Sequence, residues 1–516
     1  MDKARRTALA GAAALVIALV IAPAASALDQ VNTNPLRKAV TVNGILRHER
    51  ALQAIANANL GTRVSGTAGF DQSADYVKRQ LVQAGYKVSE QSFEFPFFLQ
   101  TSPAAFERVT PSPRVFTDEE FATMSYSGSG DVTAKLQAVD VVVPIANNPP
   151  STSTSGCEPA DFAGFTPGNI ALMQRGTCDF RVKADNAEAA GATGAVIFNE
   201  GQAPAGPGDE DRRVTLQGTL GTPGVGIPVV GTSYAIGEEL TNQTRAGDVS
   251  VHLFTETISE TRTTKNVIAD YKGGGDPSQT IVVGSHLDSV PEGPGINDNG
   301  SGTATDLETA IQVAKLGLTP RRALRFAFWG AEEEGLLGST HYVETLGAKV
   351  NDIYANLNFD MLASPNYVRF VYDGDGSDTG TAGPPGSGQI EALFNQYYAG
   401  QGLATDPTAF DGRSDYGPFI DVGIPAGGLF SGAEGEKTEA QAATYGGTAG
   451  EPYDACYHQA CDTTNNLSTK ALNELGDGVV HATWTLAKSK SGLFEDQSLR
   501  AKKAIKGKTD GPLAIR

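Results

Sequence analysis

Histidine, acidic and amide side chains gather in three short segments of the chain. They are GSHLDS at residues 284–289, GINDNGSG at 295–302 and FWGAEEEG at 328–335. Imidazole nitrogen and carboxylate oxygen together are ligands that suit zinc. The sequence therefore predicts a metal site that performs hydrolysis.

His286 and Asp288 stand two residues apart at the end of a predicted strand, so both side chains lie on one face. One of them can bind a metal while the other orients a ligand. Taken alone, the pair is more typical of an ordinary loop histidine beside an acid. Asp298 lies in a glycine-rich loop before a predicted helix, where an aspartate also serves in capping or in a turn.

Three consecutive glutamates, residues 332–334, follow an apolar run that ends at Trp329. Adjacent residues at a strand end diverge, so one carboxylate can bind a metal while the next activates a water molecule. The alternative is a solvated helix start, which the helix dipole favours. Asp360 ends another apolar run, where it is either a ligand or a turn former.

The segment CYHQACD at 456–462 places Tyr457 and His458 inside a tight loop between two cysteines. A disulfide across this loop would orient both side chains, and Tyr457 could then donate a hydrogen bond to a developing oxyanion. The alternative is a stapled surface loop. The other histidines lack acidic partners at strand ends and are expected to be structural; they are His48, His252, His341 and His481.

The N-terminal residues 1–27 have the pattern of a secretory signal peptide. A basic start with Lys3, Arg5 and Arg6 precedes an apolar run at 8–22 and small residues at 25–27. An uncleaved membrane anchor is the alternative, but the apolar run is short for a span. We expect an extracellular protein without stable membrane insertion, whose four cysteines pair as Cys157 with Cys178 and Cys456 with Cys461. The net charge of −19 argues against a nucleic-acid-binding face.

Changes in the pattern of apolar, Gly and Pro residues divide the chain into segments. Helices at 46–57 and 72–84 and a strand at 86–95 predict one part of a domain at 28–116. Residues 117–257 change to short β-like runs broken by Gly and Pro, which indicates an inserted domain. These runs are at 139–144, 169–174, 195–198 and 225–231, with a helix at 180–190. The main core resumes at 258–490, and the Lys-rich tail at 491–516 lacks apolar periodicity.

Strands and helices alternate through the core. Strands are predicted at 280–284, 324–329, 354–361 and 424–430, and helices at 302–315, 389–398 and 468–488. This order favours an α/β fold with a mixed, largely parallel sheet flanked by helices. Ligands of such sheets lie at the carboxyl ends of the strands. His286, Glu332 and Asp360 all follow or end strand-like runs, so they are expected to share one site.

The combined motifs resemble the secreted di-zinc aminopeptidases of peptidase clan MH, in particular actinobacterial leucine aminopeptidases. The matching segments run in family order through 262–490: GSHLDS, GINDNGSG, RFAFWGAEEEG, NLNFDM, FDGRSDYGPF, GIPAGGLFSG and CYHQACDT. The likeness implies the zinc exopeptidase fold. The insert resembles a protease-associated (PA) domain through Cys157, RGTCDF at 175–180, GAVIF at 194–198 and IPVV at 227–230.

Carried over by position, the resemblance implies two zinc ions per chain. Asp298 bridges them, His286 and Asp360 complete one site, and Glu333 and His458 complete the other. The resemblance also assigns roles around the metals. Glu332 is the general base and acid, Tyr457 stabilises the oxyanion, Asp288 supports His286, and Arg413 and Phe430 shape the site for the substrate's N-terminal end. A calcium site known in some relatives has no motif to support it here.

The resemblance therefore predicts a secreted, monomeric aminopeptidase that removes leucine or other apolar residues from the N-termini of peptides or proteins. Another zinc hydrolase of the same clan, such as a carboxypeptidase or a cyclase, is the first alternative. A non-catalytic binding protein with a PA domain is the second. The intact set of ligands argues against the second alternative.

Overall fold

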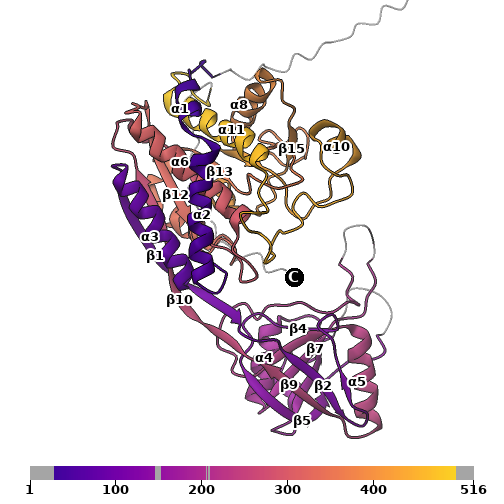
Figure 1. Cartoon of the computed structure of the whole chain (residues 1–516). Helices are drawn as coiled ribbons and strands as arrows, with labels where there is room; N and C mark the ends of the chain where they lie inside the picture. The colour runs from indigo at the N-terminus through magenta and orange to yellow at the C-terminus, as the bar shows by residue number, and fades with distance from the viewer. Residues whose placement is uncertain (1–27, 146–152, 205, 207–209, 495–516) are drawn as a thin grey trace, which may run out of the picture.

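The computed structural model describes residues 28–145, 153–204, 206 and 210–494. The expected signal segment 1–27 and residues 495–516 of the expected tail lie outside these ranges. The chain forms two domains, each built on its own sheet, and a long pair of strands runs from one into the other (Figure 1). Among the described residues, no helix is both long and apolar enough to cross a membrane.

The sheet of the larger domain is mixed, with a parallel centre. Four neighbouring strands, β12, β11, β13 and β16, run parallel, and antiparallel pairs join them to the strands on either side. This confirms the predicted α/β architecture. In sheet order the strands are β1 (Lys87–Gln100), β10 (Thr257–Asp270), β12 (Arg322–Trp329), β11 (Asp276–His286), β13 (Ile353–Phe359), β16 (Ala426–Phe430), β14 (Phe370–Tyr372) and β15 (Asp406–Thr408).

Alternating side chains of the central strands pack on opposite faces of this sheet. Phe326 and Phe328 of β12 belong to the large core on one face, whereas Trp329 belongs to a smaller core on the other. Because both faces are covered, the strands read as nearly continuous apolar runs. The large core is covered by α2 (Val42–Ala58), α3 (Ala68–Gln83), α6 (Gly302–Lys315), α8 (Ser387–Gly400) and α11 (Thr469–Lys488), and the smaller one by α7 (Leu337–Leu346) and α9 (Gly417–Asp421).

His481 of α11 joins this helix to the N-terminal segment of the described chain. Its Nδ1 lies 3.0 Å from Oγ1 of Thr33, just before α1 (Asn34–Ala39), and its ring stacks on Tyr397 at 4.4 Å. Burial, aided by the nearby cation of Arg37, lowers the pKa of His481 to about 4. The imidazole is therefore neutral in the folded protein at pH values where the unfolded chain binds a proton.

Acidification is expected to destabilise the protein through His481. The buried neutral imidazole contributes its full stabilisation above the pKa of the unfolded state, about 6.5. This contribution is lost as the pH falls towards 4, and the free energy of unfolding decreases by up to about 3 kcal/mol. Urea unfolding of the wild type and of His481→Gln between pH 7.5 and 4 measures this, with His341→Gln as a control on α7. Parallel pH profiles for the wild type and His481→Gln would contradict the assignment.

The second domain is also built on a mixed sheet. Its order is β3 (Arg114–Val115), β2 (Ala105–Thr110), β9 (Ser250–Thr255), β5 (Gly130–Ala138), β6 (Ile170–Gln174), β7 (Gly194–Phe198), β8 (Val229–Thr232) and β4 (Phe121–Thr123), with β5 to β8 parallel. Two helices, α4 (Phe180–Ala189) and α5 (Tyr234–Ala246), pack on it. The disulfide Cys157–Cys178 forms as predicted.

Two details of the second domain differ from the sequence-based expectation. Its sheet begins at Ala105 rather than at residue 117, because β2 pairs with β9. The predicted strand at 139–144 is wrong. The strand is β5, which ends at Ala138, and the valines that follow it, Val139 and Val143, are buried in irregular chain. Burial of these two valines explains only part of that apolar run, since Val142 is 43% exposed.

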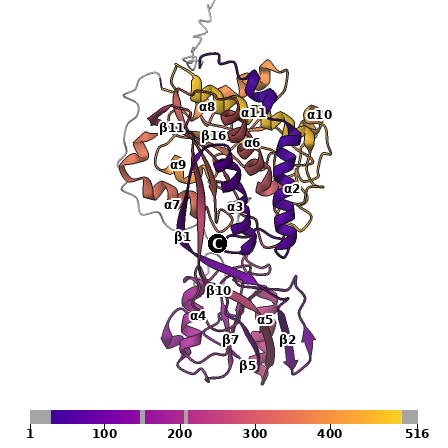
Figure 2. The same cartoon turned by 60° about the vertical axis from the view of Figure 1, so that its left-hand side comes forward.

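Strands β1 and β10 connect the two domains. They pair antiparallel along their whole length, from Lys87 opposite Asp270 to Gln100 opposite Thr257. One end of this ribbon lies in the larger sheet, where β10 pairs with β12, and the other end enters the second domain. Both views show the ribbon spanning the junction (Figures 1 and 2).

Candidate metal centre

Three parallel strands deliver acidic and imidazole groups to one edge of the sheet. β11 ends at His286, β12 ends at Trp329 just before the glutamates, and β13 ends just before Asp360. In the ladder, His286 lies opposite Trp329, and β11 pairs with β12 on one side and β13 on the other. The carboxyl ends of these strands therefore bring together residues that are far apart in sequence.

Asp298 joins this group from the buried loop 295–301 between β11 and α6. Its Oδ1 lies 3.2 Å from Nε2 of His286, and its Oδ2 lies 3.2 Å from Nε2 of His458. The loop begins with a tight turn that requires glycine. Gly295 has a φ of 60°, and a Cβ there would lie 2.2 Å from the carbonyl oxygen of Asp298. The carboxylate of Asp298 thus faces both histidines, each with a different oxygen.

Two groups of donors share Asp298. In the first, Nε2 of His286 lies 3.3 Å from Oδ1 of Asp360, and in the second, Nε2 of His458 lies 3.2 Å from Oε2 of Glu333. Tetrahedral zinc with bonds of about 2.0–2.1 Å places its ligands about 3.3 Å apart. The observed separations match that spacing. The donor types and their geometry therefore suit zinc, with Asp298 shared by both groups.

Glu332 is buried beside the two groups but outside their spacing. Its Oε2 lies 3.9 Å from Nε2 of His286, compared with 3.2 Å for Asp298. The neighbouring Asp288 accepts hydrogen bonds from the backbone N–H groups of Glu332 and Glu333, each at 3.3 Å. Asp288 also lies 3.7 Å from Nδ1 of His286, which is an ionic contact rather than a short hydrogen bond. Its main contacts therefore orient the glutamates.

The acidic groups of the site repel one another in a buried setting. Burial, reinforced by Asp298, raises the pKa of Glu333 to about 7. Burial also raises the pKa of Glu332 well above its usual value, and Asp415, whose pKa burial raises to about 8, adds to this. Bound cations offset such repulsion and favour the ionised carboxylates. The charge of the site is therefore matched to divalent metal.

Tyr457 and His458 lie on a short loop closed by the predicted disulfide Cys456–Cys461. Their rings stack with centroids 3.9 Å apart. Asp454 attaches this loop to the loop of Asp298, because its carboxylate accepts from the backbone of Cys456 at 2.8 Å and from Nδ2 of Asn297 at 2.6 Å. Asp454 therefore ties the loop that carries His458 to the loop that carries Asp298.

The two residues expected near the substrate's N-terminal end have clear partners in the structure. Arg413 forms an ion pair with Glu434, Nη1 to Oε1, at 2.8 Å, and its Nη2 lies 3.4 Å from the hydroxyl oxygen of Tyr457. Phe430 ends β16 and stacks on Phe370 with centroids 6.0 Å apart. Arg413 thus contacts the oxyanion candidate, whereas the described contacts of Phe430 are with an aromatic cluster.

Several residues that support the site were missing from the sequence-based prediction. Asp462 accepts from the backbone N–H groups of Asn297 at 2.8 Å and Asp298 at 3.0 Å, and Ser414 donates to Oδ2 of Asp360 at 2.6 Å. The buried Arg63 donates to the carbonyl oxygens of Leu287, Pro294 and Gly295. Asp462 lies beside the CYHQAC motif, which was a usable signal. Ser414 lies in the matching segment FDGRSDYGPF, but nothing in the sequence pointed to its contact with Asp360, and Arg63 had no signal because its partners are distant in sequence.

Two zinc-type donor groups and an adjacent buried carboxylate, held at the strand ends of a parallel-centred sheet, are the parts that metal-assisted hydrolysis needs. The chain belongs to peptidase family M28, whose model matches residues 266–483, and a PA domain matches residues 134–240. Both matches agree with the two domains of the structure and with the predicted resemblance.

Known relatives support this assignment. An aminopeptidase of Pseudomonas aeruginosa is 44% identical over 472 residues, covering 91% of this chain and 85% of the relative. A probable leucine aminopeptidase 2 of Aspergillus oryzae is 40% identical, covering 80% and 77%. Among solved structures, an aminopeptidase from Aneurinibacillus sp. strain AM-1 is 26% identical with a TM-score of 0.63, covering 90% of this chain and 98% of that one. A zinc aminopeptidase from Bacillus subtilis has a TM-score of 0.55 at 25% identity, covering 88% and 95%.

Proposed function

We propose that this protein is an exported zinc aminopeptidase that holds two zinc ions and removes apolar residues, leucine foremost, from peptide N-termini. The observation that carries the proposal is the placement of Asp298, whose two oxygens each face a different histidine–carboxylate group. The leucine preference rests on the names of the relatives and on the resemblance to leucine aminopeptidases of the actinobacterial type.

Zinc bound at these residues supplies a Lewis acid that polarises the scissile carbonyl and lowers the pKa of water. Each donor group has its own chain residues: His286 and Asp360 on one side of Asp298, and His458 and Glu333 on the other. Glu332 takes the proton from the attacking water and then delivers it to the departing amine. Tyr457 donates a hydrogen bond to the oxygen that becomes negative.

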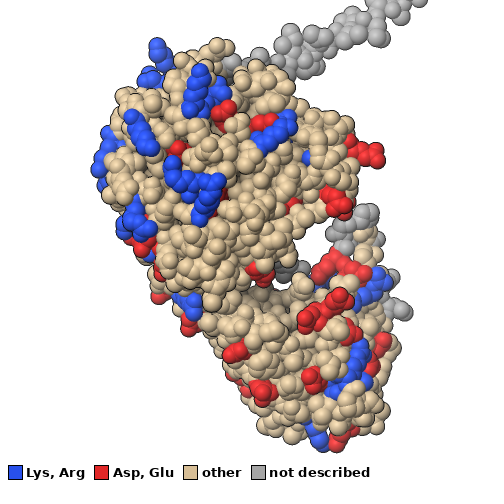
Figure 3. All heavy atoms as spheres, viewed as in Figure 1, with Lys and Arg blue, Asp and Glu red and all other residues tan. Residues whose placement is uncertain are grey.

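The negative charge of the site favours substrates with a free N-terminal ammonium. Glu332 and Asp360 on one side of His286, and Asp298 and Glu333 on the other, place several carboxylates in one small region. In the space-filling view, an opening separates the two domains and acidic side chains are visible on both of its sides (Figure 3). These acidic side chains attract a cationic group that approaches the opening before it makes any direct contact.

Export and a monomeric state complete the proposal. Both cysteine pairs are disulfides, which persist in oxidising compartments. The N-terminal sequence pattern of a signal peptide agrees with this. All residues of the proposed two-metal site belong to one chain, which supports a monomeric enzyme.

A panel of aminoacyl-anilides, assayed with and without a chelator, tests the proposal. Leucine anilide is expected to be cleaved at least about 10³-fold more efficiently in kcat/KM than its N-acetyl form, because the site is built to bind the free amine. Chelation is expected to abolish both reactions, and added zinc to restore them. The measurement is anilide release together with metal content by mass spectrometry.

Other outcomes identify the alternatives. Hydrolysis of N-blocked peptides with a free C-terminus would indicate a carboxypeptidase, and cyclisation of N-terminal glutamine would indicate a cyclase. Peptide binding without any chelator-sensitive reaction would indicate a binding protein. Each of these results would overturn the aminopeptidase proposal.

A further inference from the structure

The hydroxyl of Tyr457 receives a hydrogen bond from a side chain that can only donate. Nη2 of Arg413 lies 3.4 Å from the hydroxyl oxygen. A guanidinium has five N–H donors and no acceptor. The oxygen of Tyr457 must therefore accept in this contact, and its own proton must point away from Arg413.

Rotation of that O–H bond is the main freedom left to Tyr457. Its ring stacks on His458 with centroids 3.9 Å apart and an interplanar angle of 25°, and the disulfide Cys456–Cys461 closes its loop. The phenol ring is thus held in place by its neighbours. A hydroxyl proton free to rotate would be aimed at an oxyanion only part of the time, so fixing it pre-organises the donor.

Glu434 holds Arg413 in the position from which it reaches Tyr457. Its Oε1 lies 2.8 Å from Nη1 of Arg413, while Nη2 reaches the tyrosine. The two nitrogens of one planar group therefore serve different partners, which lysine cannot reproduce. The backbone N–H of Arg413 also donates to Oδ1 of Asp411 at 3.1 Å.

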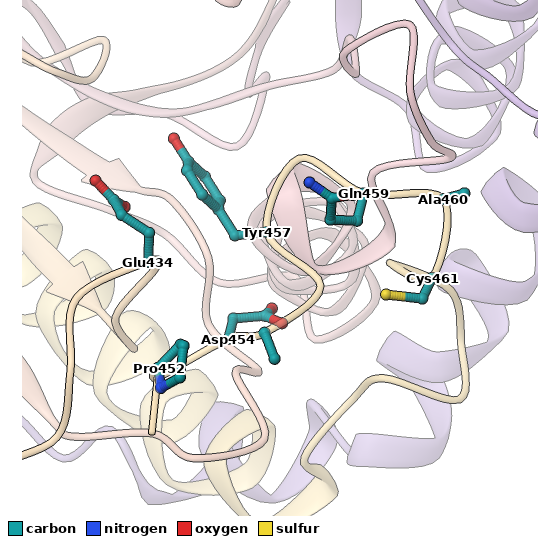
Figure 4. A pocket seen from close by; sticks show the side chains of 8 residues that line it. Glu434, Pro452, Asp454, Tyr457, Gln459, Ala460 and Cys461 are labelled. Atoms are coloured by element: carbon teal, nitrogen blue, oxygen red, sulfur yellow. The ribbon is translucent and has the colours of Figure 1, made fainter. Parts of the chain in front are cut away.

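Two of the three residues in this arrangement line a pocket beside the disulfide loop. Glu434 and Tyr457 line it together with Asp454 and the disulfide loop, and its volume is about 480 Å³. The carboxylate of Glu434 and the hydroxyl of Tyr457 extend in the same direction from neighbouring loops (Figure 4). Arg413 contacts both groups, Glu434 through Nη1 and Tyr457 through Nη2.

We propose that Glu434 is a positioning residue that acts through Arg413 to aim the hydroxyl proton of Tyr457 at the developing oxyanion. This inference rests on the proposed function, because it needs Tyr457 as the oxyanion donor. Under this proposal, Arg413 helps to stabilise the transition state through Tyr457 and does not bind the substrate's N-terminal end. Arg413→Ala should then lower kcat and leave KM almost unchanged, because the interaction matters only as negative charge develops.

The competing interpretation is an ordinary surface ion pair. The side chains of Arg413 and Glu434 are 60% and 55% exposed, and exposed pairs contribute little to stability. Under that interpretation, breaking the pair leaves kcat unchanged. Lys135 and Asp248 in the second domain form a comparable exposed pair at 2.7 Å, so Asp248→Asn is a matched control.

A double-mutant cycle with Tyr457→Phe tests the proposal. In the wild-type background, Arg413→Ala is expected to lower kcat about 10-fold with KM within about 2-fold, since a hydrogen bond from a charged donor is lost. In the Tyr457→Phe background, which lacks the hydroxyl, the same change is expected to alter kcat by less than about 2-fold. Glu434→Gln should show the same pattern with a loss of about 3-fold, and Asp248→Asn no loss.

Three results would overturn the proposal. One is an equal loss from Arg413→Ala with and without the Tyr457 hydroxyl, which would mean independent action. Another is a rise in KM with kcat retained, which would mean that Arg413 binds substrate. The third is wild-type kcat in Arg413→Ala. Zinc content measured in every variant excludes metal loss as the cause. A wild-type enzyme without aminopeptidase activity would instead contradict the proposed function itself.

Discussion

Replacement of Glu332 by Gln is expected to lower kcat by about 10³-fold while zinc remains bound, since general acid–base catalysis contributes about 10²–10⁴-fold. Glutamine keeps the shape of the side chain but cannot take a proton from water. Oε2 of Glu332 lies 3.9 Å from Nε2 of His286, farther than the 3.2 Å of Asp298 and the 3.3 Å of Asp360, so zinc is expected to stay bound without its charge. Steady-state kinetics and metal analysis of the same preparation measure both effects.

The adjacent glutamates provide controls within one turn. Glu334→Gln is expected to retain activity within about 3-fold, as is usual for a change outside the reacting groups. Glu333→Gln should instead lose metal, because Oε2 of Glu333 lies 3.2 Å from Nε2 of His458. If Glu332→Gln loses zinc and Glu333→Gln retains it, the two roles are exchanged. Near-wild-type activity of Glu332→Gln with full zinc would remove Glu332 from the mechanism.

Asp298→Asn is the second change with a large expected effect. An amide oxygen can serve one metal, but the amide nitrogen cannot serve the other, so zinc content is expected to fall to one ion or fewer per chain. The loss in kcat/KM is expected to be at least about 10²-fold, since loss of a residue that only supports a metal ligand already costs about 10–100-fold. Metal analysis after dialysis against trace zinc measures the stoichiometry.

Asp306 offers a matched control on the helix that follows. It is fully buried in α6, and burial raises the pKa of its carboxyl well above the usual value, which favours the protonated form that asparagine resembles. Asp306→Asn is therefore expected to retain zinc and activity. Two bound zinc ions and full activity in Asp298→Asn would rule out a shared carboxylate. Zinc loss in both variants would point to damage of the loop rather than to a lost ligand.

Much of the fold follows from local patterns. The apolar runs at 280–284 and 324–329 became β11 and β12, and the helix predicted at 302–315 is α6 with the same bounds. These elements are long or strongly apolar, so their pattern identifies them. The boundary at 117 differed because β2 pairs with β9, a partner far along the chain that no local period reveals.

The candidate site was predictable to the extent that it lies at strand ends. His286, Glu332 and Asp360 each end or follow a strand, and parallel neighbours bring such residues together. His458 and Tyr457 were different. They come from a loop with no period, and only the resemblance to a family linked them to the other ligands.

By itself the sequence determined the residue types and their order along the chain, with histidine, aspartate and glutamate at or near predicted strand ends, and this pattern predicted a metal site. What only the tertiary structure decided is how each group is held. Asp462 and Asp454 anchor the loops that carry Asp298 and His458. Asp288 orients the glutamates, and Arg413, paired with Glu434, contacts Tyr457. Such contacts join loops that are distant in sequence, and their energies depend on burial and direction, which appear only when the chain has folded.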